Sequence, residues 1–155
     1  MIKIQYAEIE DVLSWMELVR FVSRNFPGLE TEEGILDYEK TLIKNIHERS
    51  AICAKESEKI VGVLLFSIKN NMLSCLATHP NYRKRGVATK MLSEMLTKLD
   101  TTKDITVSTF REDDEKGIAP RALYEKFGFV EGELIQQFGH GSQIFVLHPQ
   151  NSITK

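Results

Sequence analysis

The sequence changes its periodicity at Arg83-Lys84-Arg85-Gly86-Val87-Ala88. The apolar run at residues 72–78 comes before it and is typical of a short buried strand. After it, apolar residues recur at helical spacing as far as Leu99, which predicts a helix with one face on the core. The stretch is therefore predicted to be a tight loop between a strand and a helix.

Three consecutive cations before a helix predict an anionic ligand, because the helix macrodipole already places positive charge at that end. Gly86 has no Cβ to block a close approach, and the free amides of the first helical turn point into the loop. Together these features form a cradle for phosphate oxygens. A solvated basic turn is the alternative for so short a motif.

Two flanking segments extend the pattern: Leu76-Ala77-Thr78-His79-Pro80-Asn81-Tyr82 upstream and Leu123-Tyr124-Glu125-Lys126-Phe127-Gly128-Phe129 downstream. This combination resembles the GCN5-related N-acetyltransferase (GNAT) family. Its members bind acetyl-coenzyme A (acetyl-CoA) through an Arg/Gln-x-x-Gly-x-Gly/Ala loop and carry a Leu-Tyr-Glu-Lys-x-Gly-Phe segment near the C-terminus. The resemblance implies acetyl-CoA as cosubstrate and a fold that covers nearly the whole chain.

The resemblance implies an α/β fold, with a mixed, mostly antiparallel sheet of about seven strands flanked by about four helices. We expect one domain over residues 1–148 and a frayed tail over 149–155. The local patterns predict strands at 1–6, 51–55, 60–68, 72–78, 105–110, 134–138 and 144–147, and helices at 9–22, 31–49, 88–99 and 120–127. Residues 111–116 are predicted to be a solvated charged loop, and 139–142 a turn.

The middle of the sheet is predicted at Ile60–Phe66, which is apolar on both alternating faces, as in a strand covered by helices on each side. Short connections at 57–59 and 70–71 favour antiparallel hairpins. A strand, helix and strand of this length imply that 72–78 and 105–110 lie parallel and close together.

Composition excludes several classes of protein. The 155 residues carry 20 basic and 22 acidic side chains, and this balance argues against general nucleic-acid binding. The longest apolar run is too short to span a bilayer, and no secretory signal is visible, so a cytoplasmic location is expected. Cys53 and Cys75 are predicted to be reduced core thiols, without a disulfide or a metal site.

The cofactor would lie beyond the carboxyl ends of the parallel strands, where open α/β sheets bind ligands. The resemblance implies that these strands splay there, that β-strand backbone contacts the pantetheine and that residues 83–88 hold the pyrophosphate, with a further hydroxyl from Thr89. The predicted cofactor-binding residues are Leu76, Ala77, Thr78, Arg83, Lys84, Arg85, Gly86, Val87, Ala88 and Thr89.

Acetyl transfer from a thioester to an amine makes two proton demands. An alkylamine, with a pKa of about 10.4, must lose a proton, and the departing thiolate, with a thiol pKa of about 8.5, gains from receiving one. Tyr124 occupies the position that the family assigns to the general acid. The alternative is a helix tyrosine that packs its ring on the sheet and leaves its hydroxyl in water.

The general base and the acceptor are less defined. The strands at 72–78 and 105–110 contain no carboxylate or histidine, which leaves Glu30, Glu32, Glu33 or a water chain ending in Ser74 or Ser108. His79 is interpreted as shaping the turn before the basic loop. An acidic segment beside two exposed apolar residues would suit a cationic, partly apolar acceptor; the predicted substrate-binding residues are Phe26, Leu29, Glu30 and Ser108.

The sequence departs from the family pattern at Gly117 and Pro120, where many members carry asparagine and alanine. We interpret the chain as an N-acetyltransferase that acts by direct transfer to a primary amine of a small molecule or peptide. Acylation of Cys75 is the less favoured route. A non-catalytic acyl-CoA-binding regulatory domain and a plain interaction module are the alternatives. A homodimer is compatible with the family, but no residue is assigned to an interface, to the acceptor's identity or to acyl chain length.

Overall fold

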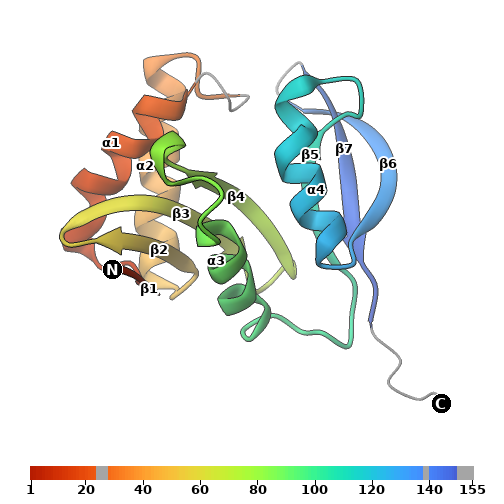
Figure 1. Ribbon diagram of the computed structural model, residues 1–155. Coiled ribbons are helices and arrows are strands. Elements are labelled where there is room, and N and C mark those ends of the chain that lie inside the picture. The colour runs from red at the N-terminus through yellow and green to blue at the C-terminus, as the bar shows by residue number, and fades with distance from the viewer. Residues whose placement is uncertain (24–27, 138–139, 150–155) are drawn as a thin grey trace.

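The computed structural model describes residues 1–23, 28–137 and 140–149 (Figure 1). The strands are β1 (Ile2–Tyr6), β2 (Ala51–Glu56), β3 (Lys59–Ser67), β4 (Met72–Thr78), β5 (Ile105–Phe110), β6 (Val130–Gln137) and β7 (His140–Leu147). The helices are α1 (Val12–Val22), α2 (Glu32–His47), α3 (Val87–Leu96) and α4 (Ile118–Lys126), with short 3-10 helices η1 (Ile9–Asp11), η3 (Pro80–Tyr82) and η4 (Glu115–Gly117). The predicted α/β fold with a mostly antiparallel sheet is confirmed.

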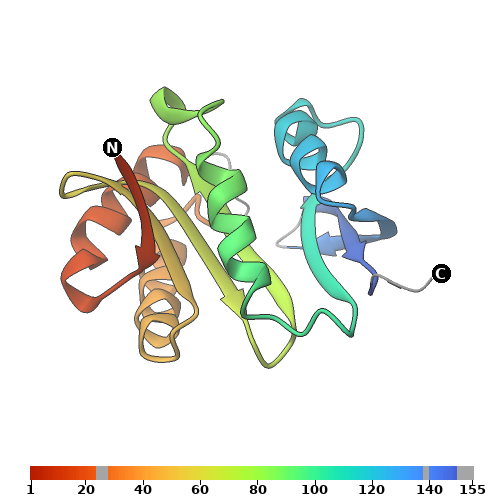
Figure 2. The same ribbon diagram turned by 60° about the horizontal axis from the view of Figure 1, so that its bottom comes forward.

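The seven strands form one sheet in the order β1-β2-β3-β4-β5-β7-β6, in which only β4 and β5 are parallel neighbours. Strand β3 is buried on both faces, as its sequence predicts, and it contributes to both hydrophobic cores. One core lies under α1 and α2 and includes the fully buried Trp15. The other lies under α3 and α4. Figure 2 shows the helices on opposite faces of the sheet.

The hairpin turns rest on residues that adopt positive φ. Ser57 has φ 56° between β2 and β3, and Asn71 has φ 52° between β3 and β4. The Asn71 side chain also donates to the carbonyls of Asp100 and Asp104 and accepts from the Asp100 amide. Asn71 therefore ties this turn to the segment that enters β5.

Strands β4 and β5 pair only at one end. Their ladder consists of Met72 with Thr106 and Leu73 with Val107, whereas β4 runs on to Thr78 and β5 to Phe110. The register of β4 against β3 also shifts there, since Cys75 faces Leu65 and Leu73 faces Phe66. The residue between them is a β-bulge, which bends β4. The splay that the resemblance implied is confirmed, and Figure 1 shows the strands diverging.

The C-terminal hairpin differs from its prediction. Strands β6 and β7 are longer than the predicted 134–138 and 144–147, and β7 includes part of the predicted turn. Arg111 contacts both strands of this hairpin, because its side chain lies against Gly141 and donates to the carbonyls of Ser142 and Ile135. The prediction of a solvated loop at 111–116 is therefore wrong at its first residue. The predicted tail lies outside the described residues from 150 onward.

Candidate functional site

The bent part of β4 presents an open edge inside the sheet. Residues 75–78 pair with β3 on one side, and within the described residues no strand pairs with them on the side of β5. Unpaired backbone groups on a strand edge can bind an extended ligand through main-chain hydrogen bonds. Leu76 and Thr78 are half-buried on this edge, where the pantetheine is predicted, while the Ala77 side chain is buried in the core.

The basic loop follows η3 and ends at the start of α3. Arg83, Lys84, Arg85 and Gly86 are all exposed. Lys84 has φ 63° and Gly86 has φ 79°, so the backbone turns sharply twice before Gly86 forms the N-cap of α3. The cap is made without a side-chain hydrogen bond, which leaves the amides of the first turn pointing toward the loop. This geometry, with three cations around it, suits a phosphate group.

The start of α3 lies close to β3. A Cβ on Gly62 would come within 2.9 Å of the side chains of Val87 and Met91, so only glycine permits this approach. Val87 is just 3% exposed and can reach a ligand only through its backbone, whereas Ala88 and Thr89 are half-buried. Of these three residues at the start of α3, Thr89 alone carries a polar side chain.

An aromatic cluster supports the basic loop. The guanidinium of Arg85 lies 5.0 Å from the centre of the Tyr82 ring, and the Tyr82 hydroxyl donates to Glu56 at 2.6 Å. His79 stacks on Phe21 with ring centres 5.0 Å apart and accepts a hydrogen bond from the Asn81 amide through Nδ1. Burial, followed by the nearby cations, lowers the pKa of His79. The prediction that His79 shapes this turn is confirmed.

Tyr124 lies on α4 with its ring in the core. Its side chain is 4% exposed and contacts the rings of Phe129 and Phe145, with centre distances of 5.7 and 6.2 Å. Burial, and then the neighbouring Cys75 thiol, raise the pKa of Tyr124 well above its usual range. No described residue forms a hydrogen bond with the Tyr124 hydroxyl. The phenol is therefore a protonated donor beside β4.

Cys75 is approached from the other face of the sheet by Tyr38 of α2, for which the sequence predicted no functional role. The Tyr38 hydroxyl lies 3.3 Å from the Cys75 sulfur and accepts a hydrogen bond from the Trp15 indole at 3.0 Å. Burial raises the pKa of Cys75 to about 11. Both cysteines are free thiols, and Cys75 is un-ionised at neutral pH, as expected of a core thiol.

The buried thiols predict a loss of stability in alkali. Burial raises the pKa of Cys53 to about 12 and that of Cys75 to about 11. An unfolded thiol titrates near 8.5, so the folded chain holds these protons more tightly. The contribution of the two thiols to the free energy of unfolding is fully present below about pH 8.5 and is lost as pH rises through the folded pKa values.

We expect the free energy of unfolding, measured in urea from pH 7 to pH 10, to fall more steeply for the wild type than for Cys53→Ala. Equal slopes would contradict this assignment.

The structure describes three of the four predicted acceptor residues. Leu29, predicted to be exposed, is 8% exposed and packs in the core under α1 and α2, so that prediction is wrong. Glu30 is exposed and accepts a hydrogen bond from the Gly28 amide. Ser108 is half-buried in β5, beyond the last residue paired with β4. Phe26 lies outside the described residues.

The structure makes Glu32, one of the candidate general bases, a weaker candidate. Glu32 binds Arg20 through both oxygens, at 2.7 and 3.1 Å, and this pairing lowers the pKa of Glu32. A lowered pKa makes the carboxylate a weaker proton acceptor. In the described ranges, no cluster of histidine, cysteine or carboxylate side chains is arranged to hold a metal ion.

Gly117, one of the departures from the family pattern, has a steric cause. A Cβ at this position would lie 2.7 Å from the Cβ of Phe110. Asparagine would therefore force α4 away from β5. Pro120 lies in the first turn of α4, where a proline needs no amide partner.

A cavity of about 490 Å³ lies elsewhere, between the C-terminal ends of α3 and α4. Lys103, Ile105, Lys126 and Leu147 are among the residues that line it. Ile105 and Leu147 place this cavity at the end of the sheet where β4 and β5 are paired, and none of the lining residues is a predicted site residue. No helix in the described part of the chain is both long and apolar enough to cross a membrane.

An open strand edge, an anion-binding loop at its end and a protonated phenol beside it define a class of proteins that hold an extended, phosphate-bearing ligand in a split sheet. Comparisons with known proteins identify the family. The sequence matches the acetyltransferase (GNAT) domain model over residues 47–131. The chain therefore belongs to the GNAT acetyltransferase family, whose cosubstrate is acetyl-CoA. No curated protein matches the sequence significantly.

Solved structures share the fold at low sequence identity. A GNAT acetyltransferase from Bacillus cereus ATCC 10987 has 20% identity and a TM-score of 0.73, with 97% of this chain and 99% of that chain covered. YncA from Salmonella typhimurium, solved with its cofactor acetyl-CoA, has 11% identity and a TM-score of 0.73 over 99% and 96%. PaiA N-acetyltransferase from Thermoplasma acidophilum, solved with coenzyme A, has 19% identity and a TM-score of 0.70 over 96% and 99%.

Proposed function

We propose that this protein transfers the acetyl group of acetyl-CoA directly to a primary amine, as a single domain over residues 1–148. The observation that carries the proposal is the divergence of β4 from β5 after two residue pairs, next to the basic loop. A ligand with an extended arm and a pyrophosphate matches an open strand edge that ends at an anion-binding loop.

The residues of the chain have separate roles in this proposal. The open edge at 76–78 binds the amide-containing arm, and the loop at 83–86 with the first amides of α3 binds the pyrophosphate. Thr89 adds a hydroxyl. Bound acetyl-CoA supplies the thioester carbonyl carbon that the amine attacks.

Tyr124 then donates its proton to the departing sulfur, which would otherwise leave as a thiolate. Its raised pKa keeps the phenol protonated throughout the neutral range, so the donor is in the required state. The neutral Cys75 thiol supports direct transfer over an acylated enzyme, because the thiolate and not the thiol is the nucleophile.

The amine reaches the carbonyl from the side of α1 and α2 in this proposal. A water chain that ends in Ser74, at the bulge, or in Ser108, on β5 beyond its pairing with β4, carries the proton of the amine to solvent. The exposed carboxylate of Glu30 favours a cationic acceptor, either a small amine or a peptide. A cytoplasmic location and a homodimer remain predictions.

A non-catalytic acyl-CoA-binding domain is the second candidate. The unassigned base favours it, since neither β4 nor β5 contains a carboxylate or a histidine. Such a domain would bind acetyl-CoA and leave the thioester intact.

Calorimetry with acetyl-CoA, followed by a coenzyme A release assay over a panel of amines, tests both candidates. We expect one binding site per chain, weakened by added salt, and release that requires an amine. Binding without release for any amine would favour the regulatory domain. The absence of binding at any salt concentration would overturn both.

A further inference from the structure

Helix α4, which carries Tyr124, depends on very few anchors. It has 9 residues, and only Arg121 and Tyr124 are buried along it. An isolated helix shorter than about 12 residues is marginal in water, so tertiary contacts set its position. The placement of the Tyr124 hydroxyl therefore depends on how α4 is held against the sheet.

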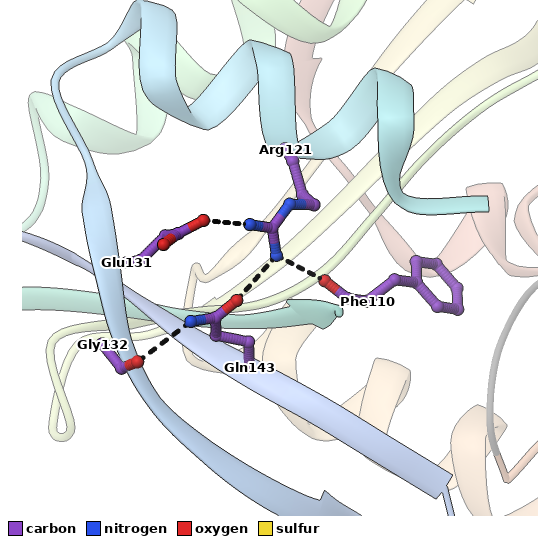
Figure 3. A network of polar contacts seen from close by, with 5 residues as sticks. All are labelled: Phe110, Arg121, Glu131, Gly132 and Gln143. Atoms are coloured by element: carbon purple, nitrogen blue, oxygen red, sulfur yellow. Dashed lines mark hydrogen bonds and ion pairs between the residues drawn. The ribbon is translucent and has the colours of Figure 1, made fainter. Parts of the chain in front are cut away.

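Arg121 is the polar anchor, and its side chain points from α4 toward the sheet (Figure 3). The residue is 7% exposed. Its Nη1 donates to the Phe110 carbonyl at 2.9 Å and to the Gln143 side-chain oxygen at 2.8 Å, and its Nη2 pairs with the carboxylate of Glu131. One guanidinium thus joins α4 to the end of β5, to β7 and to β6.

One partner of Arg121, Gln143, makes a further hydrogen bond of its own. Gln143 donates to the Gly132 carbonyl at 3.0 Å, next to the irregularity in the pairing of β6 with β7 (Figure 3). A buried cation needs full compensation, and removal of one partner leaves a charge or a carbonyl unsatisfied. Loss of any of these contacts is therefore expected to shift the Arg121 side chain.

A shared aromatic ring links this network to Tyr124. The Arg121 guanidinium lies 4.7 Å from the centre of the Phe145 ring, and the same ring packs edge-on against Tyr124 at 6.2 Å. Arg121 and Tyr124 are also three positions apart, which places them on one face of the helix. A change in the Arg121 contacts would move both the helix and the ring that orient the phenol.

We propose that Arg121 is the positioning residue for Tyr124, holding α4 through the Phe110, Gln143 and Glu131 contacts so that the hydroxyl faces β4. This inference rests on the proposed role of Tyr124 as the proton donor. Lysine cannot replace arginine here, because an ammonium lacks the planar fork that reaches several partners at fixed angles.

A double-mutant cycle of Arg121→Lys with Tyr124→Phe tests the inference. We expect Arg121→Lys alone to lower kcat about ten-fold, with KM for acetyl-CoA changed less than about two-fold. In the Tyr124→Phe background, Arg121→Lys should have almost no further effect on kcat. An equal effect in both backgrounds would overturn the positioning role and leave the proposed function intact.

Two more variants complete the design. Arg111→Lys is the matched control, because Arg111 also binds strand carbonyls but lies outside α4; any effect it has should be equal in both backgrounds. Glu131→Gln weakens the same network at a partner whose side chain is 49% exposed, and it replaces Arg121→Lys if that variant fails to fold. A Tyr124→Phe enzyme with the kcat of the wild type would instead overturn the proton-donor role itself.

Discussion

Replacement of Tyr124 by phenylalanine is expected to lower kcat about a hundred-fold, because general acid catalysis typically contributes a factor of 10² to 10⁴. The affinity for acetyl-CoA should change little, since the ring contacts with Phe129 and Phe145 are retained. Steady-state kinetics with a reactive amine, together with calorimetry, would separate the two quantities.

Tyr38→Phe is the matched control for this experiment. Tyr38 is also a buried tyrosine next to Cys75, but it approaches from the opposite face and its hydroxyl accepts from Trp15. We expect this variant to lower the free energy of unfolding, because the indole donor loses its partner, while kcat is retained. If the two variants lose activity equally, a specific role for Tyr124 is excluded.

The second large effect is expected at the basic loop. The double variant Arg83→Gln/Arg85→Gln should raise the Kd for acetyl-CoA at least about a hundred-fold, since two charge-assisted hydrogen bonds of roughly 1.5 to 3 kcal/mol each are lost. The salt dependence of binding should also weaken, because two cations no longer face the phosphates. Calorimetry at low and moderate salt measures both effects.

Lys40→Gln/Lys44→Gln makes the same change in net charge on α2, on the other face of the sheet. This control should leave the Kd for acetyl-CoA unchanged. Similar losses in the two double variants would mean that net charge, and not the loop, attracts the ligand.

The sequence predicted the elements that local signals specify. The run at Ile60–Phe66 is apolar on both faces and is the central strand, and Asn71 adopts the positive φ expected of a hairpin turn. Thr31, the first residue of the helix predicted at 31–49, caps α2 by accepting from the Gly34 amide. The loop at 83–88 combines charge, glycine and a helix start within six residues, so its geometry could be read locally.

Contacts between distant segments could not be predicted in this way. Leu29 is buried because α1 and α2 close over it. Arg111 and Arg121 belong to polar clusters whose partners lie on β6 and β7, and a charged residue in a sequence usually indicates solvent. Tyr38 meets Cys75 only after α2 packs on the sheet.

The short ladder between β4 and β5 has a consequence for the order of events in catalysis. It joins a four-stranded part of the sheet to a three-stranded part at one end only. Rotation about that junction changes the separation of Thr78 from Phe110 far more than that of Met72 from Thr106. In the proposed function, acetyl-CoA would lie between the strands and set this angle relative to β5 and α4, which carry Ser108 and Tyr124. For the proposed transfer to an amine, we therefore expect a sequential kinetic order in which acetyl-CoA binds first.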